Sequence, residues 1–167
     1  MGGAVIWRDF HEAVPELAQL VEEEFERTGV VLIGTLRRDG SPRISPVEPV
    51  FAHSQLLLGM MWRSQKALDL LRDPRCVLHS AITNPDGAEN EVKLRGRALD
   101  TQDPDLREQY HQVFRERWKL RAPASVHVFC MEIESVSVIA YDLAHGEMLV
   151  KVWDPQLDLR ETRRPYP

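Results

Sequence analysis

Two cations and a hydroxyl gather at one point of the chain, directly after an apolar segment. Arg63, Ser64 and Lys66 follow residues 57–62 and open an amphipathic stretch that an Asp-Pro pair at 73–74 ends. Ser64 is well suited to cap a helix, because its hydroxyl can accept hydrogen bonds from the free N–H groups of the first turn. A helix N-terminus with nearby cations attracts a phosphate group. These residues therefore predict an anion site, although a strand, a turn and a helix with two solvated cations explains them equally well.

The common catalytic and metal-binding motifs are absent from the sequence. It has no Gly-x-Ser-x-Gly elbow, no Walker loop and no dinucleotide-binding glycine fingerprint. The six histidines show no metal-ligand spacing with either cysteine, so no metal site is predicted. Cys76 and Cys130 lie in apolar, strand-like runs, and we expect two buried thiols rather than a disulfide. The catalytic residues stay unknown at this point.

Composition narrows the class of protein. A length of 167 residues and a mass of 19.2 kDa predict one domain spanning residues 1–167. The net charge of −5 argues against a nucleic-acid surface built on bulk positive charge. No apolar run approaches the roughly 20 residues of a membrane helix, and the N-terminus lacks the features of a secretory signal. We therefore expect a cytoplasmic protein that binds neither nucleic acid nor membrane.

Helices flank a set of short strands in the predicted element order. Apolar residues spaced by three and four predict a first helix over residues 10–25, which Gly29 ends. Asp103 and Pro104 open a later amphipathic helix, with the cap and the first-turn proline in their preferred places. Strands are predicted at residues 30–36, 42–51, 55–61, 75–82, 92–99, 126–133, 136–141 and 147–153.

The strand pattern predicts a mainly β fold with flanking helices. The first three strands are joined by tight turns, so they pair antiparallel and a parallel βαβ fold fits poorly. Three prolines interrupt the strand at 42–51, which places it at an edge or a bulge, because proline has no N–H for the ladder. We therefore expect a closed or partly closed β-barrel with helices packed outside it.

The order of short segments along the chain resembles a known family. The segments at 39–47, 58–60, 64–66, 73–75 and 92–98 look like those of the pyridoxamine 5′-phosphate oxidase-like, FMN-binding split-barrel family. The similarity is clearest over residues 30–99 and weaker at 152–155 and in the Arg-Arg-Pro ending. It implies an FMN-type split barrel, a homodimer, and a cofactor that carries the redox chemistry while the protein supplies orientation and electrostatics. A bare sheet edge at the proline-rich strand also favours a defined partner copy.

The resemblance implies a phosphate site with two departures from the family pattern. Arg43 and Lys66 match two basic positions that hold the flavin phosphate. Gln65 stands where the family often has an arginine, and Glu48 falls on a third basic position. Losing two cations and gaining an anion weakens phosphate binding, since hydrogen bonds to charged groups contribute about 1.5–3 kcal/mol each. Arg63, next to the cap, offers compensating charge.

The resemblance also assigns further residues to the cofactor site. For Glu91 an exposed edge acid is an equally good interpretation, and for Trp62 and Trp153 simple packing is the alternative. The full predicted cofactor site comprises Arg43, Ile44, Ser45, Met60, Met61, Trp62, Arg63, Ser64, Gln65, Lys66, Glu91 and Trp153.

The implied activity is a flavin-dependent oxidoreductase. Such a protein passes electrons or hydride to a small-molecule redox substrate through FMN, or alternatively through a deazaflavin coenzyme. The oxidase's C-terminal substrate-binding pattern is not recognisable, so the substrate stays unknown. The alternatives are a non-catalytic flavin- or haem-binding split barrel, with haem the less favoured ligand, and a dimeric scaffold that has lost its cofactor.

Overall fold

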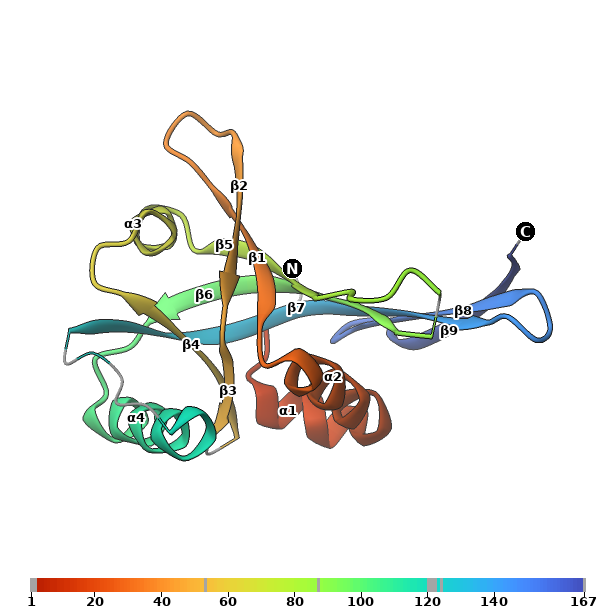
Figure 1. Ribbon diagram of the computed structural model, residues 1–167, viewed down its shortest axis with the longest axis horizontal. Coiled ribbons are helices and arrows are strands. Elements are labelled where there is room, and N and C mark those ends of the chain that lie inside the picture. Colours follow the sequence, from red (N-terminus) through yellow and green to blue (C-terminus); the bar gives the residue numbers. More distant parts are fainter. Residues whose placement is uncertain (1–2, 53, 87, 120–122, 124, 167) are drawn as a thin grey trace.

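A computed structural model describes residues 3–52, 54–86, 88–119, 123 and 125–166 (Figure 1). These residues form four helices and nine strands. In chain order they are α1 (Trp7–Ala13), α2 (Pro15–Thr28), β1 (Val31–Leu36), β2 (Pro42–Val47), β3 (Pro49–Ala52), β4 (Gln55–Met61), α3 (Gln65–Arg72), β5 (Arg75–Ser80), β6 (Glu91–Asp100), α4 (Pro104–Trp118), β7 (Val126–Asp142), β8 (Glu147–Asp154) and β9 (Asp158–Pro165).

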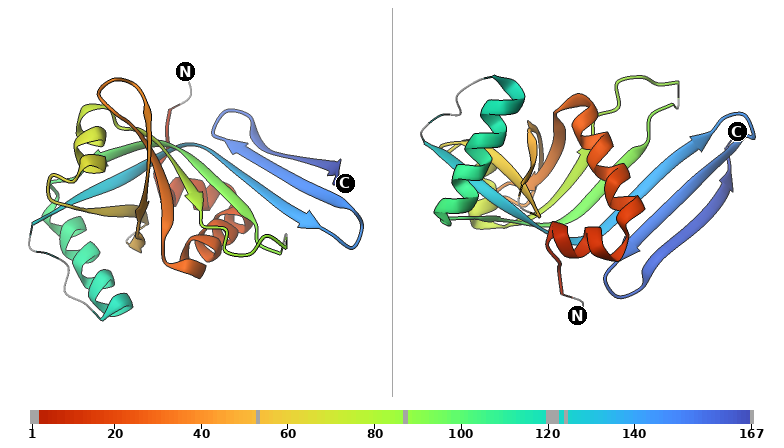
Figure 2. Two further views of the ribbon diagram at one scale, coloured as in Figure 1. Left: turned by 45° about the horizontal axis from the view of Figure 1, so that its top comes forward. Right: turned by 90° about the horizontal axis from the view of Figure 1, so that it is seen from below.

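One curved sheet contains all of these strands. Its order is β2-β1-β5-β6-β7-β4-β3, and β8 and β9 extend from β7 as a hairpin that projects from the body (Figures 1 and 2). Every pairing among the described strands is antiparallel. The sheet stays open, because β2 and β3 at its two ends pair with one neighbour each. This arrangement is a split β-barrel, and the predicted fold class is confirmed.

The proline-rich segment predicted as one strand forms two. The strand expected at 42–51 divides at Glu48 into β2 and β3, which lie at opposite ends of the sheet. The chain therefore crosses the split of the barrel through this single residue. The edge position that the prolines predicted is confirmed for both strands.

Three further element boundaries differ from the predictions. The segment predicted as the first helix forms two helices, α1 and α2, because Val14 leaves helical geometry with φ −142° and Pro15 starts α2. The strands expected at 126–133 and 136–141 are one strand, β7, which absorbs a register shift opposite Arg95 and Gly96. β9 was not predicted, because its residues are charged and exposed along their whole length. Gly29 ends α2 with φ 70°, as predicted.

Two hydrophobic clusters hold the helices on the sheet. The larger cluster joins α1 and α2 to the strands, with Phe10 and Phe25 fully buried. The smaller cluster lies under α4 and includes Tyr110, Val50 and Val128. Asp103 caps α4, because its carboxylate accepts from the backbone N–H groups of the first turn. Among the described residues, no helix has both the length and the apolar character needed to cross a membrane.

Candidate functional site

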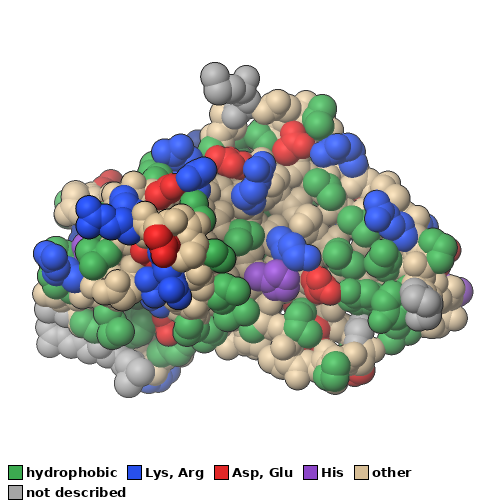
Figure 3. Space-filling model, turned by 90° about the horizontal axis from the view of Figure 1, so that it is seen from above, with side chains coloured by type: hydrophobic (Ala, Val, Ile, Leu, Met, Phe, Trp, Pro, Cys, Tyr) green, Lys and Arg blue, Asp and Glu red, His purple; other side chains and the backbone are tan. Residues whose placement is uncertain are grey.

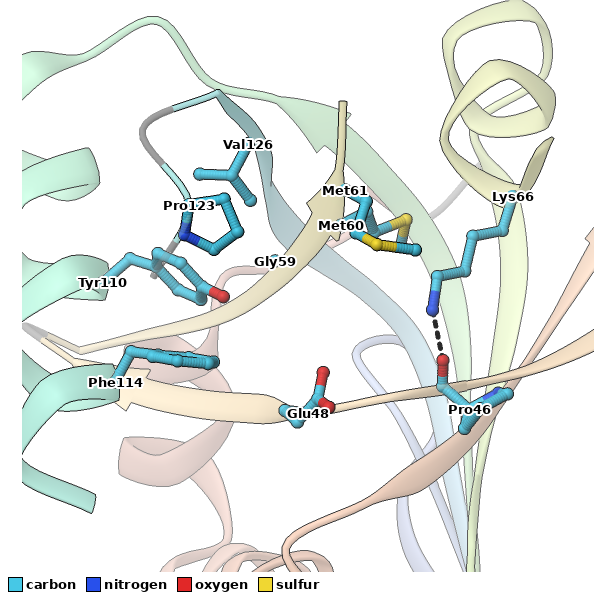
Figure 4. Close-up of a pocket in the computed structure, with 10 residues that line it drawn as sticks. All are labelled: Pro46, Glu48, Gly59, Met60, Met61, Lys66, Tyr110, Phe114, Pro123 and Val126. Atoms are coloured by element: carbon cyan, nitrogen blue, oxygen red, sulfur yellow. Dashed lines mark hydrogen bonds between the residues drawn. The ribbon is translucent and has the colours of Figure 1, made fainter. Parts of the chain in front are cut away.

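A hollow of about 220 Å³ opens between α4 and the start of α3, with β4 as its floor (Figure 4). Apolar and aromatic side chains form most of its wall, and two charged side chains face each other across one end. The lining residues are Pro46, Glu48, Gly59, Met60, Met61, Lys66, Tyr110, Phe114, Pro123 and Val126.

Lys66 is the cation of this hollow. It lies in the first turn of α3, and its Nζ donates to the backbone carbonyl of Pro46 on β2 (Figure 4). Burial lowers the pKa of Lys66 below its ordinary value, and the Glu48 carboxylate offsets part of that shift. A second anion beside Lys66, such as a phosphate, would favour its charged form further.

The opposite wall belongs to α4. Tyr110 is only 2% exposed, and its ring lies directly over Gly59. A Cβ at position 59 would stand 1.9 Å from the tyrosine hydroxyl oxygen, so the glycine is what lets α4 approach β4. Burial, and then the nearby Glu48 carboxylate, raise the pKa of Tyr110 above its ordinary range. The hydroxyl therefore stays protonated and can act as a hydrogen-bond donor.

Arg43, expected beside Lys66 at the phosphate site, does not line the hollow that Lys66 lines. It lines a separate polar hollow of about 440 Å³ that also contains Gln65 and Asp69. The Nε of Arg43 donates to Oδ2 of Asp69 at 2.7 Å. Within this chain the guanidinium of Arg43 is therefore paired with the buried carboxylate of Asp69 on α3.

Asp69 is the centre of a polar network that joins three elements. Its carboxylate accepts from Thr35 on β1 at 3.0 Å and from Arg43 on β2 at 2.7 Å, and Arg72 lies 3.3 Å away. Burial alone would raise the pKa of Asp69, but the hydrogen bonds from Arg43 and Thr35 outweigh it and hold that pKa below its ordinary value.

Ser64 occupies the N-cap position of α3 but does not make the predicted capping bond. Its side chain forms no hydrogen bond to the first turn. Its Oγ is buried and has no partner within the described part of the chain. Arg63 precedes it in the left-handed region, with φ 56°. The Ser64 hydroxyl therefore has hydrogen-bonding capacity that the described residues do not use, and the first N–H groups of α3 have no intrahelical partner.

Among the other predicted residues, Met60 and Met61 line the hollow, whereas Ile44 and Trp62 do not. Ile44, Met61 and Trp62 are 72%, 70% and 59% exposed, whereas Met60 is buried. The Trp62 ring stacks on His127, with centroids 4.4 Å apart and an interplanar angle of 10°. Ser45, half-buried on β2, is the remaining residue of this group.

Glu91 and Trp153 lie elsewhere in the fold. Glu91 starts β6 and accepts a hydrogen bond from the Tyr141 hydroxyl, beside a different hollow. Trp153 is 2% exposed and packs against Phe10 in the larger core, with ring centroids 4.8 Å apart. Within this chain the structure therefore places both apart from the α3 hollow, and packing explains Trp153.

The sequence interpretation missed the α4 wall. Tyr110 and Phe114 lie in the amphipathic helix predicted after Asp103, and their distance along the chain from Lys66 hid their common location. The signal that could have indicated their role was the hydroxyl of Tyr110, which is a polar group on an otherwise apolar helix face. Gly59 was a second signal, because a glycine inside a strand marks a close approach.

A broad apolar surface covers the outer face of β1, β2 and β5. Two shallow hollows of about 430 and 370 Å³ share Gly34, Ile44 and Val77. The same side of the molecule carries hydrophobic side chains among many Lys and Arg side chains (Figure 3). Within the described ranges, no cluster of three or more His, Cys, Asp or Glu side chains forms a metal site. Cys76 and Cys130 are free thiols.

The comparisons with known proteins agree with this geometry. Residues 17–140 match the family model described as pyridoxamine 5′-phosphate oxidase. The chain therefore belongs to the pyridoxamine 5′-phosphate oxidase family, as its segment order predicted. The comparison with curated proteins found no match.

Solved structures share the fold at low sequence identity. A pyridoxamine 5′-phosphate oxidase-related, FMN-binding protein from Nostoc punctiforme is 12% identical, with a TM-score of 0.62 over 90% of this chain and 95% of that one. A haem-binding protein from Mycobacterium smegmatis is 14% identical, with a TM-score of 0.58 over 88% of each chain. The haem storage protein HutZ from Vibrio cholerae is 16% identical, with a TM-score of 0.59 over 73% of this chain and 90% of that one.

Proposed function

We propose that this chain binds FMN at the start of α3 and acts as a flavin-dependent oxidoreductase on a small-molecule substrate. The observation that carries the proposal is Lys66. In a chain of this family, Lys66 places a cation at a hollow beside the start of α3. The Ser64 hydroxyl at the same helix start has no partner among the described residues. Phosphate groups bind to that combination of charge and free N–H groups.

The residues present fit a flavin phosphate, with one opposing charge. Lys66, the Ser64 hydroxyl and the first N–H groups of α3 would hold the phosphate, and Arg63 is next to them. Glu48 repels it across the hollow. FMN, when bound, supplies the hydride or electron transfer. The chain's own part is to orient the ligand and to keep water from its apolar side through Met60 and Tyr110.

We propose a homodimer as well, and the size of the site supports it. At about 220 Å³ the hollow is smaller than the roughly 300–1,000 Å³ of typical ligand pockets. Met61 lines it and is 70% exposed, and a second copy would cover that side chain and add the missing wall. Light scattering at micromolar concentration is expected to give twice the chain mass of 19.2 kDa, and a single-chain mass contradicts the dimer.

Two other ligands remain open under this proposal. A deazaflavin coenzyme would use the same features, since it also joins an apolar ring system to a phosphate. Haem binding without turnover is supported by the two haem proteins among the structural neighbours. Absorption spectra recorded after addition of FMN, a deazaflavin or haemin separate the three. The free thiols of Cys76 and Cys130 agree with a reducing, cytoplasmic location.

The decisive experiment compares FMN with riboflavin, which lacks the phosphate. Lys66→Met keeps most of the side-chain length and removes the charge, and we expect it to weaken FMN binding about ten- to a hundredfold while riboflavin binding is unchanged. Lys151→Met is the matched control, because Lys151 pairs with Glu161 on the distant β8–β9 hairpin. Flavin fluorescence titration gives all the dissociation constants. An equal loss for both ligands, or none for FMN, refutes the assignment of the phosphate to Lys66.

A further inference from the structure

The hollow carries one cation and one anion. Lys66 and Glu48 are the charged residues of its lining, Lys66 on α3 and Glu48 at the crossing between β2 and β3 (Figure 4). They form no salt bridge with each other in the part of the chain that the structure describes, and the ammonium of Lys66 donates to the Pro46 carbonyl instead. Arg63 precedes the helix start and does not line the hollow. The formal charges that a ligand meets there therefore sum to zero.

The negative charge of Glu48 acts on both walls of the hollow. On α4, burial and then the Glu48 carboxylate raise the pKa of Tyr110, so this wall stays neutral. On α3, burial lowers the pKa of Lys66, and the Glu48 carboxylate offsets part of that shift. Arg117, a further cation of α4, pairs with Glu26 at 3.2 Å. The electrostatic balance inside the hollow is thus set by Lys66 and Glu48.

The charge of a phosphate group depends on how many of its oxygens are esterified. A monoester such as FMN carries a charge of about −1.5 to −2 at pH 7, because its second pKa is near 6, whereas a diester carries a single negative charge. Lys66 alone would attract the doubly charged group more strongly, but Glu48 offsets that gain. The doubly charged group also costs more to desolvate. A singly charged phosphate is therefore the better match to this pair of residues.

We propose that Glu48 makes this site selective for a singly charged phosphate, so that a flavin phosphodiester binds in preference to the monoester FMN. The selectivity rests on the proposed flavin function and concerns the phosphate group of the same ligand. The lining supports it, because Met60, Met61 and Phe114 offer apolar contacts to an ester group. A bare phosphate oxygen in the same place would lose its hydration. FMN binds best in its singly protonated form.

The test uses three ligands with the same ring system: riboflavin, FMN, and the monomethyl ester of FMN, which is a phosphodiester. The full-length protein is titrated with each ligand at about pH 8, where the monoester is fully ionised, and flavin fluorescence gives the dissociation constants. We expect both esters to bind more tightly than riboflavin, and the methyl ester to bind roughly tenfold more tightly than FMN. A methyl ester that binds no more tightly than FMN overturns the proposal.

Two variants locate the source of the preference. Glu48→Gln keeps the side-chain shape and removes the charge. Both esters then gain affinity, but FMN gains more because it carries more charge, so the preference for the methyl ester disappears. Glu12→Gln is the control, since the Glu12 side chain is 71% exposed on α1, and it keeps the preference. A preference that survives in Glu48→Gln shows that this carboxylate does not select the phosphate.

The dependence on pH is a check that needs no variant. Between about pH 8 and about pH 5.5 the phosphate of FMN takes up a proton and becomes singly charged. The ratio of the FMN and methyl-ester dissociation constants should therefore fall toward one in acid. A change in the charge of Lys66 affects both esters and largely cancels in this ratio. A ratio that stays constant over this range contradicts the proposal.

Riboflavin separates this proposal from the flavin assignment itself. If both esters bind more tightly than riboflavin but equally well, the charge selectivity alone is refuted. If neither ester binds more tightly than riboflavin, no phosphate is held at the start of α3, and the proposed function fails together with the selectivity.

Discussion

Replacing Asp69 by Asn is expected to lower the stability of the fold strongly, although the two side chains have almost the same shape. The carboxylate is 5% exposed and accepts from Thr35, while its ion-pair partner Arg43 is 23% exposed. Asparagine keeps the volume but leaves the guanidinium of Arg43 partly buried without its counter-charge. Breaking a buried ion pair costs about 3–5 kcal/mol. The partial exposure of Arg43 reduces this, so we expect a loss of about 2–4 kcal/mol in the free energy of unfolding.

This loss is measured by urea denaturation monitored by circular dichroism. If the m-value is unchanged, the shift of the transition midpoint gives the change in the free energy of unfolding. In a thermal melt it corresponds to about 5–15 °C for a chain of this size. Asp9→Asn is the matched control, because the Asp9 side chain is 45% exposed and pairs with the exposed Arg8, and its effect should stay within about 0.5 kcal/mol.

The dependence on pH gives a second, independent check. The pKa of Asp69 lies below its ordinary value of 3.8, because the hydrogen bonds from Arg43 and Thr35 outweigh burial. A group with a lowered folded-state pKa contributes stability that is complete above its unfolded pKa and is lost as the pH falls through the folded value. The stability gap between the protein and Asp69→Asn should therefore be constant near neutral pH and close below pH 3.8. A gap that is under 1 kcal/mol at neutral pH, or one that widens in acid, refutes the ion-pair account.

Two further changes test the cofactor site and the α4 wall. Gln65→Arg adds a cation at the first residue of α3, next to Lys66 and to the N–H groups proposed to hold the phosphate, and FMN should bind about one to two decades more tightly; equal tightening of riboflavin in the same titration would show that residue 65 does not meet the phosphate. Gly59→Ala places a methyl group 1.9 Å from the Tyr110 hydroxyl oxygen, and overpacking of this kind should lower the unfolding free energy by about 1–3 kcal/mol. Chemical denaturation measures the second effect, and an unchanged midpoint contradicts the close contact.

Local signals were sufficient to predict many of the elements. Asp103 and Gly29 marked a helix start and a helix end correctly, because caps depend on the residue itself and its immediate neighbours. The prolines of residues 42–51 correctly predicted edge strands, since a missing N–H is a local property. The resemblance to the family predicted the FMN-type split barrel, and it directed attention to the segment around Lys66.

Contacts between distant segments could not be predicted in the same way. Arg43 matched a phosphate-binding position, and only the tertiary structure shows that Asp69, on another element, pairs with it. Tyr110 on α4 and Lys66 on α3 line the same hollow, and nothing in the local sequence links the two. Trp153 is compatible with a ligand wall or a core position, and the packing of α1 against β8 decides for the core.

The crossing at Glu48 also bears on how the barrel holds together. β2 and β3 lie at opposite ends of the hydrogen-bonded path, yet only one residue separates Val47 from Pro49. Two consecutive Cα steps span at most about 7.6 Å, so the chain itself tethers the two ends of the sheet where no ladder does. The separation of the two ends at this corner is therefore limited by covalent geometry rather than by hydrogen bonds. The residue that makes this link also supplies the carboxylate in the hollow.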